Sequence, residues 1–258
     1  MATVNPSITQ AGMDEDFALQ LARGQIYNHS SINKFGGSPE VAADTKEDVW
    51  DGAGTYTFST TADITHVRSA VDSATTQDAT IEVQGLNANW DLVVQTKDLD
   101  GDDSTTEVEL GTPLIRIFRM KVLENAVMDQ DIWAGDDDFV VGAAKAIITA
   151  GHNQTLMAIY TVPDDCTAYM TAYYASVVDT TNKTPTSTEI GMWAADRDNG
   201  YEFQLKHQMG IAQAASGFRN EFYPYYKFNK KTDIKITALP TDEPAHVHAG
   251  FDLILVKN

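Results

Sequence analysis

The strongest constraint on the fold of this chain is a succession of short segments in which apolar and polar residues alternate with a period of two. The alternation is clearest at residues 80–84 and 106–110, and it predicts strands that bury one face and expose the other. Further strands are predicted at 114–122, 156–162, 168–178, 189–194, 201–209, 233–239 and 247–255. Turn residues separate these segments, which favours antiparallel connections.

The clearest turn signal lies at residues 196–200, a polar stretch that ends in Asn199-Gly200, a pair that favours positive φ. It predicts a hairpin between 189–194 and 201–209. Helical periodicity is confined to residues 14–23, where Phe17 and Leu21 share a face behind an acidic start. Many short strands and almost no helix predict an all-β fold. We expect a jelly-roll-like β-sandwich with an extended N-terminal arm and one short N-terminal helix.

The composition changes near Gly54. Residues 28–54 contain Gly36, Gly37, Pro39 and Gly52, which interrupt any period and predict an extended arm or a long ordered loop. The predicted organisation is therefore an N-terminal helix and arm over residues 1–54, followed by a single sandwich domain over residues 55–258. The sequence leaves open whether the arm reaches a neighbouring molecule or packs on its own domain.

The charge balance excludes several classes of partner. The 258 residues include 18 Lys and Arg against 37 Asp and Glu, a net charge of −19. Binding of nucleic acid or of an anionic membrane surface begins with basic residues that neutralise negative charge, so neither partner is expected. Cys166 is the only cysteine, which rules out a disulfide framework within the chain. The N-terminus does not resemble a signal peptide, and no run approaches the ~18–20 apolar residues of a membrane span.

One acidic stretch imitates a calcium loop. Asp98, Asp100 and Asp102, with Glu109, have the acid spacing of an EF-hand. The glycine required at the sixth position is replaced by Asp103, and the flanks alternate as strands. A solvated acidic turn is therefore the favoured interpretation, with a weak Ca²⁺ site as the alternative. Residues 136–138 form a second acidic loop of the same kind.

His246 and His248 are two residues apart, which places both imidazoles on one face of a strand. Such a pair can bind Zn²⁺ or Ni²⁺ when further residues complete the coordination. No other residue has a spacing that indicates a third ligand. Exposed polar positions on an amphipathic strand are the simpler interpretation.

No pattern typical of catalysis is present. The sequence lacks a nucleophile elbow, a zinc-protease helix, a phosphate-binding glycine loop and a dinucleotide fingerprint, so we expect neither catalytic residues nor a cofactor. Cys166 follows Asp164 and Asp165, whose negative charge raises the pKa of a thiol and makes it unreactive.

An aromatic cluster surrounds Pro224: Phe218, Phe222, Tyr223, Tyr225, Tyr226 and Phe228. Rings at this density are typical of a strand that crosses the core or of a protein contact. The candidate interface residues are Phe222, Tyr223, Tyr225 and Tyr226. Basic residues beside them, Lys227, Lys230 and Lys231, favour contact with an acidic surface.

Two regions resemble a known group of proteins. Residues 21–26 (LARGQI), 32–37 (INKFGG) and 47–52 (EDVWDG) resemble the N-terminal region of structural proteins of tailed bacteriophages, especially marine ones. Residues 146–148, 151–163 and 167–169 are similar to the same group. The resemblance implies a virion component, and β-rich members of this size often decorate or cement the capsid as trimers.

The resemblance implies a capsid surface location, the major capsid protein as partner and a homotrimer, after synthesis in the host cytoplasm. The candidate capsid-binding residues are Ile32, Asn33, Lys34, Phe35, Gly36, Gly37 and Trp50, with Phe35 and Trp50 as apolar anchors. One alternative is an adaptor in the tail or a head fibre. Another is a carbohydrate-binding β-sandwich, which would use Trp90, Trp133 and Trp193 beside paired carboxylates.

Overall fold

A computed structural model describes residues 15–71, 79–99, 106–123, 128–137, 143–179, 185–212, 215 and 217–258. It confirms the all-β fold, because antiparallel sheets make up most of the described chain. The predicted helix is present as α2 (Phe17–Ala22), and the Asp16 carboxylate caps it by accepting hydrogen bonds from the backbone N–H groups of Ala18 and Leu19.

Eight strands build a jelly roll, which we call the large sandwich. The first sheet has the order β1 (His29–Val41), β16 (Ala245–Lys257), β11 (Cys166–Asp179) and β14 (Gly217–Phe228). The second has the order β10 (Ile159–Thr161), β15 (Thr232–Pro240), β12 (Ser187–Asp196) and β13 (Gln204–Ala212), and β2 (Glu47–Asp48) adds to β15. If the eight strands β1 and β10 to β16 are renumbered 1 to 8 along the chain, the two sheets have the strand orders 1-8-3-6 and 2-7-4-5. This is the arrangement of a jelly roll.

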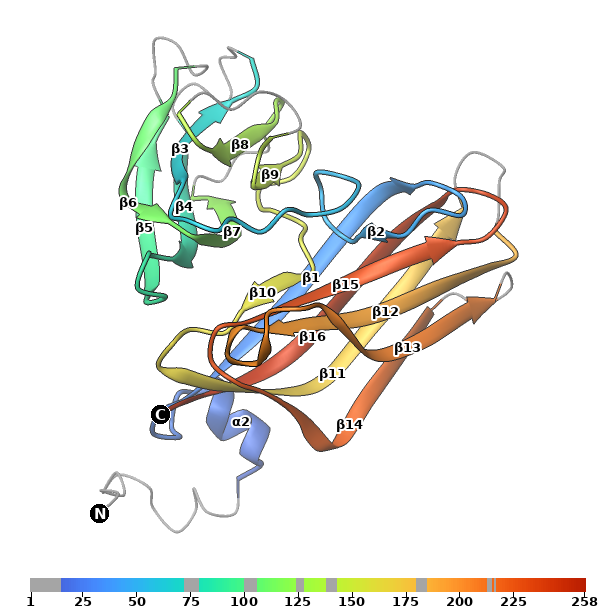
Figure 1. Cartoon of the computed structure of the whole chain (residues 1–258). Coiled ribbons are helices and arrows are strands. Elements are labelled where there is room, and N and C mark those ends of the chain that lie inside the picture. Colours follow the sequence, from blue (N-terminus) through green and yellow to red (C-terminus); the bar gives the residue numbers. More distant parts are fainter. Residues whose placement is uncertain are drawn as a thin grey trace.

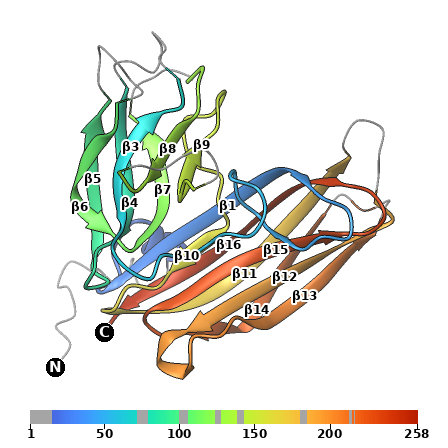
Figure 2. The same ribbon diagram turned by 45° about the horizontal axis from the view of Figure 1, so that its top comes forward.

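A small lobe is inserted between β1 and β10 (Figure 1). One of its sheets contains β6 (Val108–Leu114), β3 (Ile64–Ser69), β8 (Ile132–Gly135) and β9 (Ala146–Ile148). The other contains β5 (Leu92–Asp98), β4 (Thr80–Leu86) and β7 (Arg116–Val122). Figure 2 shows this lobe beside the large sandwich, close to β1 and β10.

The two lobes have separate apolar cores that meet. In β16 the odd-numbered residues from Ala245 to Leu255, such as Val247 and Phe251, are buried, as the predicted alternation requires. Trp90 and Phe118 come from the small lobe yet pack in the core of the large sandwich, and Ile159 of β10 packs in the core of the small lobe. Apolar contact therefore holds the lobes together.

The prediction for residues 28–54 is an extended arm or a long ordered loop, but His29–Val41 form the strand β1, which pairs with β16 inside the large sandwich. Gly36, which interrupts the alternation of apolar and polar residues, does not form a turn but lies where another segment of the chain crosses closely. A Cβ on Gly36 would lie 2.3 Å from the backbone nitrogen of Ala158 and 2.5 Å from the carbonyl oxygen of Val49, so only glycine fits beneath this crossing chain. Since β1 and β2 are both paired in the large sandwich, residues 29–48 belong to that sandwich.

The predicted hairpin is confirmed. Strands β12 and β13 pair from Ser187↔Ala212 to Ala194↔Gln204. The turn contains the short 3₁₀ helix η1 (Arg197–Asn199) and ends at Gly200, whose φ of 88° is left-handed. Within the described part of the chain, no helix is long and apolar enough to cross a membrane.

Candidate functional site

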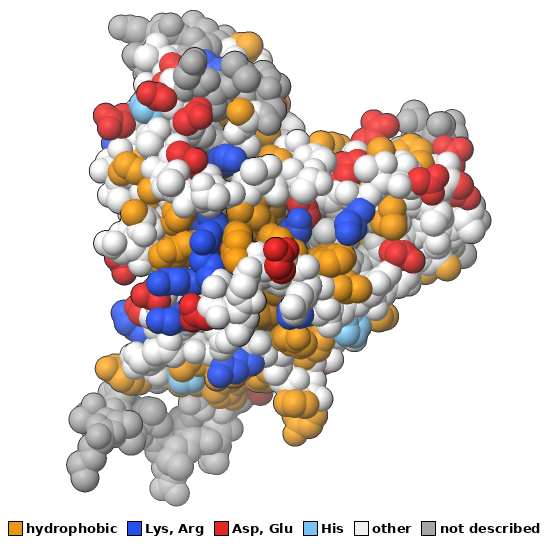
Figure 3. All heavy atoms as spheres, viewed as in Figure 1, with side chains coloured by type: hydrophobic (Ala, Val, Ile, Leu, Met, Phe, Trp, Pro, Cys, Tyr) orange, Lys and Arg blue, Asp and Glu red, His pale blue; other side chains and the backbone are white. Residues whose placement is uncertain are grey.

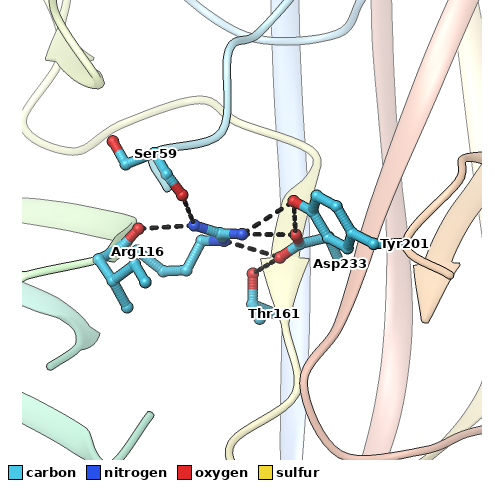
Figure 4. A network of polar contacts seen from close by, with 6 residues as sticks. Ser59, Arg116, Thr161, Tyr201 and Asp233 are labelled. Carbon is cyan, nitrogen blue, oxygen red and sulfur yellow. Dashed lines mark hydrogen bonds and ion pairs between the residues drawn. The ribbon is translucent and has the colours of Figure 1, made fainter. Parts of the chain in front are cut away.

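A buried ion pair joins the two lobes (Figure 4). Arg116 begins β7 of the small lobe, and Asp233 lies on β15 of the large sandwich. The guanidinium Nε donates to Asp233 Oδ1 at 2.8 Å, and Nη2 donates to Oδ2 at 2.7 Å. The side chains are 2% and 0% exposed, so this bidentate contact is shielded from solvent.

Neighbouring groups satisfy the rest of this cluster, which we call the clamp. Arg116 Nη1 also donates to the carbonyl oxygens of Ser59 and Ile115, at 2.5 and 2.8 Å. The hydroxyl groups of Thr161 and Tyr201 donate to the Asp233 carboxylate. Burial opposes the charge on Arg116, but the hydrogen bonds and charge of Asp233 outweigh it, so the pKa of Arg116 is raised.

Aromatic rings enclose the clamp. The Arg116 guanidinium lies 5.0 Å from the ring centre of Trp90, and that of Arg197 lies 4.5 Å from the same ring. Burial, and then the charge of Asp233, raise the pKa of Tyr201 to about 12, so its hydroxyl stays protonated at neutral pH. The Arg116–Asp233 pair is shielded from solvent and fully hydrogen-bonded, so the clamp is a structural joint.

The most exposed aromatic feature is a bulge in β14. The ladder pairs Ala172 with Glu221 and Met170 with Tyr226, so the single β11 residue Thr171 faces residues 222–225. We call these four residues, Phe222, Tyr223, Pro224 and Tyr225, the tyrosine knuckle. Tyr223 is 99% exposed and Tyr225 is 47% exposed. Figure 3 shows hydrophobic side chains projecting where β14 bends in Figure 1.

The knuckle rests on packed rings. Phe222 stacks on Tyr173 with ring centres 5.9 Å apart and planes 16° apart, and Tyr226 packs edge-on against Phe222. The Tyr173 hydroxyl lies 2.7 Å from His207 Nδ1. The aromatic cluster is therefore divided: Phe222 and Tyr226 pack on the core, whereas Tyr223 and Tyr225 face solvent.

The predicted capsid-binding residues of β1 are only partly accessible. Lys34, Gly36 and Gly37 are buried, Ile32 and Phe35 are half-buried, and Asn33 is exposed. Trp50 is 7% exposed and packs edge-on against Tyr56 with ring centres 5.0 Å apart. The prediction of Trp50 as an exposed anchor is therefore wrong, because the chain after β2 turns into the core of the small lobe.

Phe35 lines a shallow cavity of about 370 Å³ on the outer face of the first sheet. Leu156, Tyr174 and His248 form further walls, and Gly217 lies at one end. Beside it, Asn33 donates hydrogen bonds to Asp252 and to the Tyr174 hydroxyl, at 2.6 and 3.0 Å. Of the candidate capsid-binding residues, Phe35 and Asn33 are thus the two that offer side-chain surface on this face.

Sequence reasoning missed two buried basic residues. The Lys34 amine donates to the Phe118 carbonyl oxygen, and burial, helped by the charge of Arg119, lowers its pKa well below the ordinary value. No local signal marks them, since residues 114–122 contain three basic residues, Arg116, Arg119 and Lys121, and Lys34 lies in a strand with several polar residues. Such a residue needs a distant partner, and the local pattern does not say which one.

The structure describes one of the three predicted metal candidates. Asp98 ends β5 and accepts a hydrogen bond from Thr80 at 2.8 Å, whereas Asp100 and Asp102 lie outside the described residues. Of the second acidic loop, 136 and 137 are exposed and 138 is outside the described residues. No group of three or more His, Cys, Asp or Glu in the described ranges is arranged to hold a metal ion.

The thiol and the tryptophans are poorly placed for chemistry or sugar binding. Burial, and then the hydrogen bond and charge of Asp165, raise the pKa of Cys166 to about 12, in the predicted direction. Trp90 and Trp133 are 8% and 7% exposed, and the half-buried Trp193 is covered by the Lys46 amine at 4.3 Å from its ring centre. These three tryptophans do not form the exposed platform that a carbohydrate site needs.

No protein-family model and no curated protein matches this chain. A function for it therefore has to be argued from its own surface and chemistry.

Proposed function

We propose that this chain is a non-enzymatic virion structural protein of a tailed bacteriophage. In this proposal it is a decoration or cement protein that binds and stabilises the lattice of the major capsid protein. It acts on the capsid surface as a homotrimer, after synthesis in the host cytoplasm. Residues 21–26, 32–37 and 47–52, which resemble phage structural proteins, support this assignment.

The observation that carries the proposal is the tyrosine knuckle. Tyr223 and Tyr225 present exposed ring surface on a bulge that stacked rings support from below. Tyrosine is enriched among the residues that dominate binding energy at protein interfaces. Because Phe222 is already packed on Tyr173, the knuckle needs little ordering when a partner binds, which lowers the entropic cost of association.

The clamp supports a bridging role. A protein that links neighbouring capsid subunits must hold its contact surfaces at a fixed separation. Arg116 and Asp233 connect the lobes through two hydrogen bonds shielded from solvent, and the apolar cores of the lobes also meet. Both features resist rotation of one lobe against the other.

A tail or head-fibre adaptor is the alternative function. It would use the same exposed knuckle on a different partner, so the distinction lies in what the protein binds.

The test is co-sedimentation of the purified protein with capsids that lack it. Wild-type protein should bind saturably, and Tyr223→Ala/Tyr225→Ala should bind at least ~10-fold more weakly, as expected when a hot spot of about 2 kcal/mol is lost. Tyr27→Ala is the matched control, because Tyr27 is also exposed, at 70%, but lies between α2 and β1. Its binding should equal that of the wild type.

Two outcomes would contradict the proposal. Wild-type protein that ignores capsids but binds tail assemblies would favour the adaptor function. Equal capsid binding by the wild type and the double variant would show that the knuckle is not part of the interface. The native mass of the free protein tests the trimer separately.

A further inference from the structure

Two histidines stand side by side on the outer face of the first sheet. His246 and His248 alternate on β16 with Val247 and Ala249, which are buried in the core. The ring centres of His246 and His248 are 4.4 Å apart, and the planes are tilted by 43°. The strand therefore presents both imidazoles together on the side away from the core.

The ring nitrogens are available. Neither imidazole makes a hydrogen bond to another group in the described part of the chain. His248 pairs with Gly37 of β1 and Ser176 of β11, and a Cβ on Gly37 would lie 3.1 Å from His248 Nδ1. The Nδ1 edge of the ring therefore rests on β1, which leaves Nε2 on the side farther from that strand.

The spacing of the rings matches one coordination geometry. A metal bonded to an imidazole nitrogen at about 2.0–2.1 Å lies about 3.2 Å from the ring centre. Two rings bound at about 90° then have centres about 4.5 Å apart, and two rings bound at the tetrahedral angle have centres about 5.2 Å apart. The observed 4.4 Å is close to the spacing for adjacent positions of a tetragonal or octahedral ion, which is reached when one nitrogen of each ring turns toward the same ion.

We propose that His246 and His248 form a two-histidine binding site for a divalent transition-metal ion with tetragonal coordination, Cu²⁺ first and Ni²⁺ second. Imidazole is a preferred ligand of both ions, and Cu²⁺ has the higher affinity for a given set of nitrogen ligands. Water occupies the remaining positions, because no third His, Cys, Asp or Glu in the described ranges completes the site.

The surroundings suit a cation. The net charge of −19 attracts cations to the protein. This site is independent of the tyrosine knuckle and of the proposed capsid function.

The experiment is a titration of untagged, full-length protein with CuCl₂, NiCl₂ and ZnCl₂, followed by calorimetry. Electron paramagnetic resonance of the Cu²⁺ complex counts the coordinated nitrogens. His246→Asn and His248→Asn should each weaken Cu²⁺ binding at least ~10-fold and remove one imidazole nitrogen from the spectrum. His29→Asn on β1 is the matched control, because His29 has no histidine two positions away, and it should bind like the wild type.

Clear results would overturn the inference. Wild-type Cu²⁺ affinity in both His246→Asn and His248→Asn would show that the bound ion lies elsewhere, for example on the terminal amine. Tighter binding of Zn²⁺ than of Cu²⁺ would contradict the tetragonal geometry. Thermal unfolding of the metal-free variants, expected at the wild-type temperature, shows whether a loss of binding reflects a loss of the fold.

Discussion

Replacing Arg116 by Met tests the clamp most directly. Methionine is a long, unbranched side chain that can fill the space of the alkyl stem. The variant leaves the Asp233 carboxylate 0% exposed, with the Thr161 and Tyr201 hydroxyls as donors but without its counter-charge. A buried charge stranded in this way costs about 3–5 kcal/mol. The unfolding temperature should fall by about 6–20 °C, at about 2–4 °C per kcal/mol for a chain of this size.

The assay is urea unfolding followed by tryptophan fluorescence, since the Trp90 ring lies 5.0 Å from the Arg116 guanidinium. Asp233→Leu and the double variant Arg116→Met/Asp233→Leu complete a thermodynamic cycle. The double variant has no stranded charge, so it should be at least about 2 kcal/mol more stable than the sum of the single effects predicts. Lys121→Met is the matched control on β7, because its ion pair with Glu82 leaves the lysine side chain 40% exposed. It should cost less than about 1 kcal/mol.

The reasoning fails if Arg116→Met costs less than about 1 kcal/mol, or if the two single effects add to within about 0.5 kcal/mol. Either result would mean that the apolar contacts alone hold the lobes together.

Two further predictions concern buried positions. Burial raises the pKa of Asp51 to about 7, whereas an aspartate in an unfolded chain titrates near 4, so wild-type stability should fall as pH rises from about 4 to 7. Asp51→Asn keeps an acceptor for the Leu156 N–H, and its urea midpoint should change less between pH 5 and pH 8; an equal change would contradict the prediction. Gly36→Ala should cost about 1–3 kcal/mol, because its Cβ would collide with the backbone of Ala158. Gly37→Ala should cost less, because its nearest contact is the His248 side chain at 3.1 Å, and thermal unfolding compares the two.

Local patterns predicted the fold class well, because they depend on neighbouring residues. Alternation at 80–84 and 247–255 gave the strands β4 and β16, whose buried faces are the predicted ones. The Asn199-Gly200 turn and the Asp16 cap also act within a few residues. Each of these signals depends on residues that are close together in the chain, so the sequence alone carries it.

Signals that depend only partly on neighbouring residues left the candidate sites undecided. The aromatic cluster around Pro224 indicated buried area or contact area without distinguishing them. The bulge opposite Thr171 makes the distinction, since it turns Tyr223 outward while Phe222 stays on Tyr173. Likewise, the spacing of His246 and His248 placed them on one face, but the 4.4 Å between their rings is a property of the folded sheet.

By itself, the sequence determined an all-β, acidic chain with many of its strands, its main hairpin and its short helix. Only the tertiary structure decided that β1 is a strand, that Trp50 is buried, and that Arg116 meets Asp233. Each of these depends on contacts between residues far apart in the chain, such as Gly36 beneath Ala158. A period of two specifies the face of a strand but not its partner, so the insertion of the small lobe between β1 and β10 leaves no local signature.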